Sequence, residues 1–387
     1  MKCKLSDICS FRKGKVEVEN LNAKNYISTE NMLPNKCGIT EASSLPTVSL
    51  TQEYNSGDVL VSNIRPYFKK IWQAEYDGGC SNDVLVFVPK PNTDKDFLYY
   101  VLADDDFFTY SMATSKGTKM PRGDKTSIMQ YEVPLIDLQV QKKIASVLKA
   151  LDERIKLNNE INNNLEQQAQ AIFKSWFINF EPFNKTMPSD WIIGTIDDLA
   201  KEVVCGKTPS TKKAEYYGSN IPFITIPDMH GKTYAVTTER YLSKLGANSQ
   251  VKKSLPKNSI CVSCIGTAGL VTLVAEESQT NQQINSIIPK DGFSPYYIYL
   301  LMQTLSDTIN KLGQSGSTIV NLNKSQFGKI QVIIPALSVM IKFDKIVSPM
   351  FEKMLQNQME NLKLTSLRDA LLPRLMSGEL DVSDIEI

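Results

Sequence analysis

The chain has 387 residues, 42% of them hydrophobic, and a formal net charge of +1. This length predicts two or three domains with real cores, and the near-neutral charge excludes a broadly basic, nonspecific polyanion binder. Seven cysteines, odd in number and widely scattered, indicate reduced thiols and a cytoplasmic protein. The sequence shows no apolar leader, and no stretch approaches the roughly 18 apolar residues of a membrane span. We therefore expect a soluble protein without a membrane partner.

Short apolar runs separated by turn residues fill residues 1–137. Residues 57–62 are typical of a turn that enters a strand, and residues 83–88 of a buried strand that ends at Pro89. Asp96 is a suitable N-cap for a helix that ends before Gly117. The pattern predicts a mixed α/β domain.

A long helix is predicted next, over residues 138–181, followed by a linker over 182–187 that begins with Pro182. Its inward positions repeat in steps of four and three, which is typical of a coiled-coil seam. The predicted seam consists of Ile144, Leu148, Leu151, Ile155, Asn158, Asn162, Leu165, Ala169, Ile172 and Trp176. Two of these positions are asparagines, which fix register or orientation when they are buried in a coiled coil.

The same plan recurs later in the chain with a constant offset, since 357 − 158 = 199 and 361 − 162 = 199. The offset gives a second seam that includes Met354, Asn357, Asn361, Leu364, Leu371 and Leu375. The predicted domains are therefore a second α/β domain over 188–336, a second long helix over 337–378 and a tail over 379–387. We expect an α+β fold of two duplicated domains, each followed by a long helix, with the helices paired as an antiparallel coiled coil.

Two residues depart from a uniform repeat. Pro349 lies inside the second helix and should kink it or restart it at Ser348. Arg368 takes the seam position that Ala169 has in the first helix. In an antiparallel pair the four seam asparagines should meet near the centre, where they either hydrogen-bond across the pair or face a partner subunit. The alternative is that they are solvated on a seam displaced by one position.

Residues suited to catalysis are few. His230 is the single histidine, and the pair Cys261 and Cys264 has no second cysteine pair or histidine to complete a zinc site. On a strand these two thiols would turn to opposite faces, which predicts buried apolar cysteines. The Gly206-Lys207-Thr208 segment ends like a phosphate-binding loop but lacks the earlier glycine. We therefore predict no catalytic residue, no metal and no cofactor.

Local clusters of cations, amides and aromatic rings could instead contact DNA, because arginine and asparagine read base edges and lysine neutralises phosphate. In the first domain the candidates are Lys13, Ser62, Asn63, Arg65, Tyr67, Lys69, Lys70, Lys116, Thr118, Lys119, Arg122 and Lys125. The cations between 116 and 125 should repel one another unless they meet an anion. In the second domain they are Lys207, Thr208, Ser210, Lys212, Lys213, Thr267, Gln282, Gln283, Ser315, Ser317 and Lys324. Each cluster alone could also be a solvated surface.

The order and duplication of these motifs resemble the specificity subunit of Type I restriction-modification systems. The resemblance covers almost the whole chain and rests on the segments Leu5-Ser6-Asp7-Ile8, Gly206-Lys207-Thr208-Pro209-Ser210, Lys174-Ser175-Trp176-Phe177 and Leu371-Leu372-Pro373-Arg374-Leu375. It implies two target recognition domains that each read half of a split double-stranded DNA sequence, with the helices as a spacer. It also implies two methyltransferase subunits and a nuclease-translocase subunit as partners. The alternatives are a coiled-coil adaptor that binds no DNA and a fused enzyme.

Overall fold

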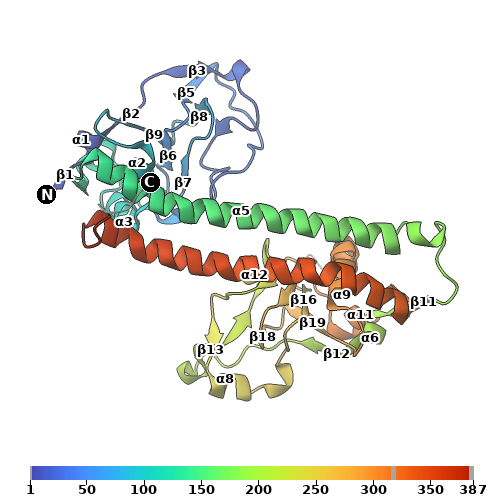
Figure 1. The fold of residues 1–387 in the computed structure, drawn as a ribbon. Coiled ribbons are helices and arrows are strands. Elements are labelled where there is room, and N and C mark those ends of the chain that lie inside the picture. Colours follow the sequence, from blue (N-terminus) through green and yellow to red (C-terminus); the bar gives the residue numbers. More distant parts are fainter. Residues whose placement is uncertain (1, 315–319, 383–387) are drawn as a thin grey trace. The chain divides into compact units, whose positions relative to one another are not determined.

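The computed structural model describes residues 2–314 and 320–382. The chain divides into two compact units, Met1–Arg154 with Lys363–Ile387 and Ile155–Leu362. Each unit contains a mixed α/β domain and one end of each of two long helices, α5 (Leu138–Phe177) and α12 (Leu337–Met376) (Figure 1). Within the described ranges, no helix is long and apolar enough to cross a membrane.

The first unit is built from short strands and a few helices. Its strands are β1 (Lys2–Lys4), β2 (Cys9–Phe11), β3 (Lys15–Glu17), β4 (Tyr26–Ile27), β5 (Leu50–Tyr54), β6 (Val59–Ser62), β7 (Ile71–Gln73), β8 (Gly78–Cys80), β9 (Val84–Pro89) and β10 (Glu132–Pro134). Its shorter helices are α1 (Leu5–Ile8), α2 (Lys95–Ala103), α3 (Asp105–Ala113) and α4 (Lys125–Ile128). Two four-stranded sheets have the orders β2-β9-β6-β7 and β3-β5-β8-β4, and β1 pairs with β10.

The second unit repeats the sheet β2-β9-β6-β7 of the first unit, but its other sheet has a different strand order. Its strands are β11 (Ile192–Thr195), β12 (Ala200–Cys205), β13 (Tyr217–Ile224), β14 (Tyr234–Ala235), β15 (Tyr241–Leu242), β16 (Ile260–Ser263), β17 (Val271–Val274), β18 (Gln279–Thr280), β19 (Ile284–Pro289) and β20 (Gln331–Ile334). Its shorter helices are α6 (Ile196–Leu199), α7 (Ile226–Met229), α8 (Lys244–Asn248), α9 (Pro295–Thr304), α10 (Ser306–Gly313) and α11 (Lys324–Gly328). The sheet β12-β19-β16-β17-β14 repeats the order of β2-β9-β6-β7, whereas the other is β15-β13-β18.

Helix α12 runs without interruption through Pro349, so the predicted restart at Ser348 is wrong. Proline removes one backbone donor, but the neighbouring turns are held by packing because Val347 and Phe351 are fully buried. Tertiary packing of an apolar face stabilises a helix more than local propensity does. Helix α5 ends at Phe177, shortly before Phe180 takes a left-handed backbone with φ of 53°.

Four asparagines connect the long helices inside the second unit. The Asn158 Nδ2 atom donates to Asn361 Oδ1 at 2.8 Å, and the Asn357 Nδ2 atom donates to Asn162 Oδ1 at 2.9 Å. The two bonds are related by the sequence offset of 199, and the Asn158 and Asn357 residues are 1% and 0% exposed. Earlier residues of one helix meet later residues of the other, which is the expected antiparallel pairing.

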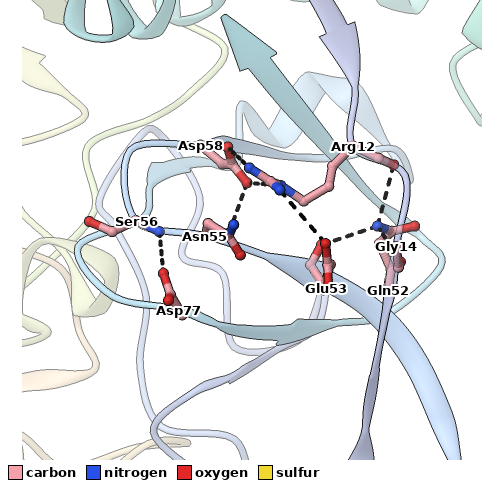
Figure 2. A network of polar contacts seen from close by, with 8 residues as sticks. All are labelled: Arg12, Gly14, Gln52, Glu53, Asn55, Ser56, Asp58 and Asp77. Atoms are coloured by element: carbon pink, nitrogen blue, oxygen red, sulfur yellow. Dashed lines mark hydrogen bonds and ion pairs between the residues drawn. The ribbon is translucent and has the colours of Figure 1, made fainter.

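Arg12, which directly follows β2, joins the two sheets of the first unit (Figure 2). Its guanidinium binds both carboxylate oxygens of Asp58 through Nε and Nη2, with the Nη2 to Oδ1 distance 2.8 Å. Its Nη1 atom lies 3.7 Å from the Glu53 carboxylate in β5 of the other sheet. The Asp58 side chain is only 4% exposed and also accepts a bond from the Asn55 backbone. The buried pair of Arg12 and Asp58 therefore lies within the sheet β2-β9-β6-β7, and the contact with Glu53 extends it to the other sheet.

The two closely spaced cysteines are buried on opposite faces of their sheet, as the strand pattern predicts. Cys261 packs with Val204 and Ile224, whereas Cys264 belongs to the core around Tyr297. Burial raises the pKa of Cys261 to about 12 and that of Cys264 to about 11. Such thiols carry little thiolate at neutral pH and should be inert.

We expect brief alkylation of the folded protein at about pH 8 to modify the exposed Cys37 and to spare Cys261 and Cys264. Mass spectrometry of tryptic peptides would measure this, with a urea-unfolded sample as the control in which all cysteines react. Equal rates at Cys37 and Cys261 in the folded protein would contradict the assignment.

Candidate nucleic-acid interface

The structure brings together the two basic segments that the sequence predicts in the first unit. Ile64 and Arg122 form an antiparallel bridge, the Arg65 amide donates to the Pro121 carbonyl at 2.8 Å, and the Gly123 amide donates to the Asn63 carbonyl at 3.1 Å. Segments that are far apart in sequence therefore share one surface.

The first of these segments has an unusual backbone. Arg65 and Lys69 adopt left-handed conformations, with φ of 52° and 49°, on either side of a 3₁₀ turn over Pro66–Phe68. A positive φ is costly for such side chains and is often found at functional sites. The turn exposes Tyr67 and Phe68, which are 49% and 38% exposed and have ring centroids 4.7 Å apart. Exposed aromatic rings beside cations are suited to a ligand with both rings and phosphates.

Several of the predicted cations already meet carboxylates of the chain. Lys116 pairs with Asp124, and Arg122 lies 3.2 Å from Asp83. The hydrogen bond from the Lys116 ammonium, with the backbone bond from Ser127, lowers the pKa of Asp124 to about 2. Two of the four clustered cations therefore already meet an anion, which is a carboxylate of the fold itself, so the clustering alone does not require an external anion.

Two lysines of the first segment also bind the chain itself. Lys69 and Lys36 share the carboxylate of Asp105, each at 2.8 Å. Burial lowers the pKa of Lys70, whose Nζ atom donates to the Thr29 carbonyl at 2.6 Å. Lysines that already bind a group of the chain are less available to a phosphate than the exposed lysines.

The remaining candidates of the first unit differ in exposure. Ser62 is buried and donates to the Ile64 carbonyl. Asn63 and Arg65 are half-buried, and the Asn63 Oδ1 and Arg65 Nε atoms are buried without a hydrogen-bond partner within the described structure. The exposed candidates are Lys13, Thr118, Lys119 and Lys125.

The second unit brings its predicted residues together in a similar way. Thr208 donates to the side chain of Gln282 at 2.7 Å, and the Lys207 amide donates to the Thr280 carbonyl at 2.9 Å. The segment after β16 pairs with the segment before α11, since the Gly266 amide donates to the Val320 carbonyl at 3.1 Å. The same scaffold thus carries a more polar and less charged surface.

The other candidates of this unit lie mostly on the surface. Lys213 donates to the Tyr216 hydroxyl at 3.1 Å and lies over that ring, 4.8 Å from its centroid. Gln283 is half-buried and accepts a bond from Asn281 at 3.0 Å. Ser210, Lys212, Thr267 and Lys324 are exposed, whereas Ser315 and Ser317 lie outside the described residues.

Sequence reasoning missed the residues that hold these loops in place. Asp83 and Asp105 pair with cations of the first unit, and Gln250 and Asn281 hold polar loops of the second. Every one of these contacts except the one within 281–283 joins residues far apart in sequence. No local pattern marks such partners.

Comparisons with known proteins agree on one family. The family model described as the Type I restriction modification DNA specificity domain matches residues 1–167 and again residues 188–363. The chain is 34% identical to the HindI specificity subunit of Haemophilus influenzae, over 92% of this chain and 94% of that protein. It is 27% identical to the MjaIX specificity subunit of Methanocaldococcus jannaschii, over 77% and 72%.

A solved structure has the same fold. The S subunit of a Type I restriction-modification system from M. genitalium superposes with a TM-score of 0.64 at 17% identity, over 97% of this chain and 96% of that one. The two family matches together cover most of the chain and coincide with its internal repeat. The chain therefore belongs to the Type I restriction modification DNA specificity domain family, with two copies of that domain.

Proposed function

We propose that the chain is the non-catalytic specificity subunit of a Type I restriction-modification complex and that it reads a bipartite double-stranded DNA target. One observation carries the proposal. Each unit places a divergent segment and two apposed polar loops on the same repeated sheet. A shared scaffold with different loops suits two readers of different half-sites, and family membership supports the same function.

The apposed loops offer the chemistry that DNA contact needs. Arg122 can exchange its ion pair with Asp83 for a guanine edge or a phosphate, and exposed Lys119 can neutralise a phosphate. In the second unit the amide of Gln282 can pair with adenine. The first surface is then expected to depend more steeply on salt than the second.

The long helices suit a spacer of fixed length. A seam of about 32 residues at about 1.5 Å per residue spans roughly 48 Å, or about 14 base pairs. The asparagine bonds across the pair support a single register, because a slipped pair would leave buried amides without partners. We propose that this register fixes the gap between the half-sites.

The proposed partners are two methyltransferase subunits and a restriction subunit. The duplicated helices and domains present equivalent surfaces twice, which suits two copies of one partner. The methyltransferase would supply the chemistry, and this chain would choose where that chemistry acts.

Mapping of methylated bases in cells that express this chain with its methyltransferase subunit tests the proposal. We expect one split sequence with a constant gap, and no methylation without this chain. Deletion of seven facing residues from each helix, at positions whose numbers sum to 519 as those of Asn158 and Asn361 do, should change the gap and keep both half-sites.

Deletion from one helix alone is the matched control, because it misaligns the asparagines and should prevent assembly. Changed bases at a constant gap would contradict the spacer. A chain that neither binds DNA nor directs methylation would instead support the adaptor alternative.

A further inference from the structure

Strand pairing shows which residues of the two units are equivalent. Phe11 pairs with Phe87 and Val203 with Ile287, and strands β9 and β19 differ in numbering by 200. Phe11 therefore corresponds to Val203, an offset of 203 − 11 = 192, and the same offset relates Gly14 to Gly206. At this point each unit leaves the repeated strand and enters the segment in which the two units differ.

A buried glutamine holds that point in the second unit. The Gln250 Nε2 atom donates to the Lys207 carbonyl at 2.8 Å and to Gln279 Oε1 at 2.8 Å. Gln279 in turn donates to the Ala247 carbonyl at 3.0 Å. Gln250 is 8% exposed and Gln279 is 1% exposed, so neither side chain lies on the surface that offers Lys207 and Thr208.

The loop that Gln250 holds has little freedom. A Cβ atom on Gly206 would lie 2.1 Å from the Asn281 carbonyl oxygen, which is too close for any side chain. The backbone of the loop therefore packs directly against the segment that carries Gln282. The Lys207 amide is bound by the Thr280 carbonyl, while its carbonyl is bound by Gln250. The backbone of Lys207 is thus fixed from both sides, and its side chain remains exposed.

The first unit has a similar contact, one residue earlier in the loop and made from a different element. The Gln52 Nε2 atom, in β5, donates to the Gly14 carbonyl at 3.0 Å and to the Glu53 carbonyl at 3.1 Å (Figure 2). Gln52 lies in a strand, whereas Gln250 follows α8. Two segments of different structure therefore place a glutamine amide on the same loop of the scaffold.

We propose that Gln250 and Gln52 are positioning residues that close the divergent segment of each unit onto the scaffold. By closing it, Gln250 fixes Lys207 and Thr208 for contact with the second half-site, and Gln52 fixes Lys13 for contact with the first. This inference rests on the proposed function. It assigns a role in specificity to two side chains that need not touch DNA.

The test uses the full chain assembled with its methyltransferase subunits and the duplex identified by methylation mapping. Binding is measured for the intact target and for duplexes in which one half-site at a time is scrambled. For Gln250→Met we expect preference for the second half-site to fall on the order of tenfold, because two buried acceptors lose their donor. Preference for the first half-site should not change. Gln52→Met should do the reverse, with a smaller effect because Gln52 is half-buried.

A double-mutant cycle separates positioning from general loss of stability. If Gln250 acts through its loop, Gln250→Met should add little to the loss caused by Lys207→Ala. Thr272→Val is the matched control, since it removes a buried hydroxyl that bonds the Lys232 carbonyl elsewhere in this unit. It should leave both preferences unchanged.

The outcomes are distinct. Unchanged second-half preference in Gln250→Met, equal loss at both halves, or a similar loss in Thr272→Val would overturn the inference. If the Gln250→Met complex does not assemble, the inference is tested with Gln52→Met, which should lower the preference for the first half-site only. A wild-type complex that prefers neither half-site would count against the proposed function instead.

Discussion

Arg12→Met is expected to lower the free energy of unfolding of the first unit by about 3 to 5 kcal/mol, because it leaves a buried charge without its partner. The Asp58 side chain is 4% exposed, and its two oxygens are bound by Arg12 (Figure 2). Methionine fills a similar volume but cannot compensate the carboxylate. The loss should fall mainly on the sheet β2-β9-β6-β7, because Arg12 directly follows β2 and Asp58 directly precedes β6.

The second unit shows how the same position is filled without charge. Strand pairing makes Val204 equivalent to Arg12 and Ser259 equivalent to Asp58. Both residues are buried, and the Ser259 hydroxyl donates to the Pro256 carbonyl at 2.7 Å. The double variant Arg12→Val with Asp58→Ser should therefore regain much of the loss, since a buried pair can often be replaced by neutral residues of suitable shape.

Hydrogen exchange of the full-length protein measures this prediction. Amides of β2 and β6 should lose protection in Arg12→Met, whereas those of β12 and β16 serve as the internal control. A double variant that is less stable than Arg12→Met, or a single variant as protected as wild type, would show that the charge pair contributes little.

The repeat was the part of the fold that the sequence predicted well. A constant offset of 199 placed four asparagines on one seam, and the structure joins Asn158 to Asn361 and Asn357 to Asn162. Helical periodicity is a local property, so both long helices could be predicted with ends close to those observed. The offset also relates the two buried members of the set, Asn158 and Asn357.

The partners of the cations could not be predicted in this way. Asp83 meets Arg122, and Asp105 meets Lys36 and Lys69, across gaps that no local period connects. A loop with four cations therefore looked like a site that needs an external anion. Tertiary contacts decide how much of that charge is free, and those contacts depend on how the strands pair.

Arg368 is explained by its neighbours in the first unit. Its Nη1 atom binds Asp152 at 2.6 Å, and Asp152 accepts the Tyr100 hydroxyl at 2.7 Å. The offset of 199 relates Asp152 to Phe351, since 152 + 199 = 351, and Ala169 to Arg368. A charged pair in one unit thus occupies the place of an aromatic and a small apolar residue in the other.

The second unit fixes its long helices with a tyrosine at a neighbouring position. The N-caps Asp94 and Ser294 align Tyr299 with Tyr99, one residue before Tyr100, and Tyr299 packs edge-on against Phe351 with ring centroids 5.5 Å apart. Its hydroxyl donates to Glu166 at 2.9 Å, and Glu166 corresponds to Thr365 in the first unit. Each unit therefore fastens its long helices to its domain through a tyrosine, with a different acceptor on each side.

Arg368→Ala should destabilise the first unit by about 3 kcal/mol, because Asp152 keeps its charge but loses the cation that offsets it. The side chains of Arg368 and Asp152 are 22% and 29% exposed, so solvent compensates only part of this loss. Urea unfolding measures this loss of free energy, and the protection of α2 amides in hydrogen exchange shows whether it falls on the first unit.

The triple variant Asp152→Phe, Thr365→Glu and Arg368→Ala gives the long helices of the first unit the residues of the second at these three positions and is the sharper experiment. If the two units share one packing plan, it should be more stable than Arg368→Ala alone, because the aromatic ring fills the space and the new carboxylate offers an acceptor to the tyrosine hydroxyls of α2. The variant without Thr365→Glu should recover less, since a buried hydroxyl then lacks an acceptor. A triple variant no more stable than Arg368→Ala would mean that the units share their sequence repeat but not the packing of α2 and α9 against the long helices.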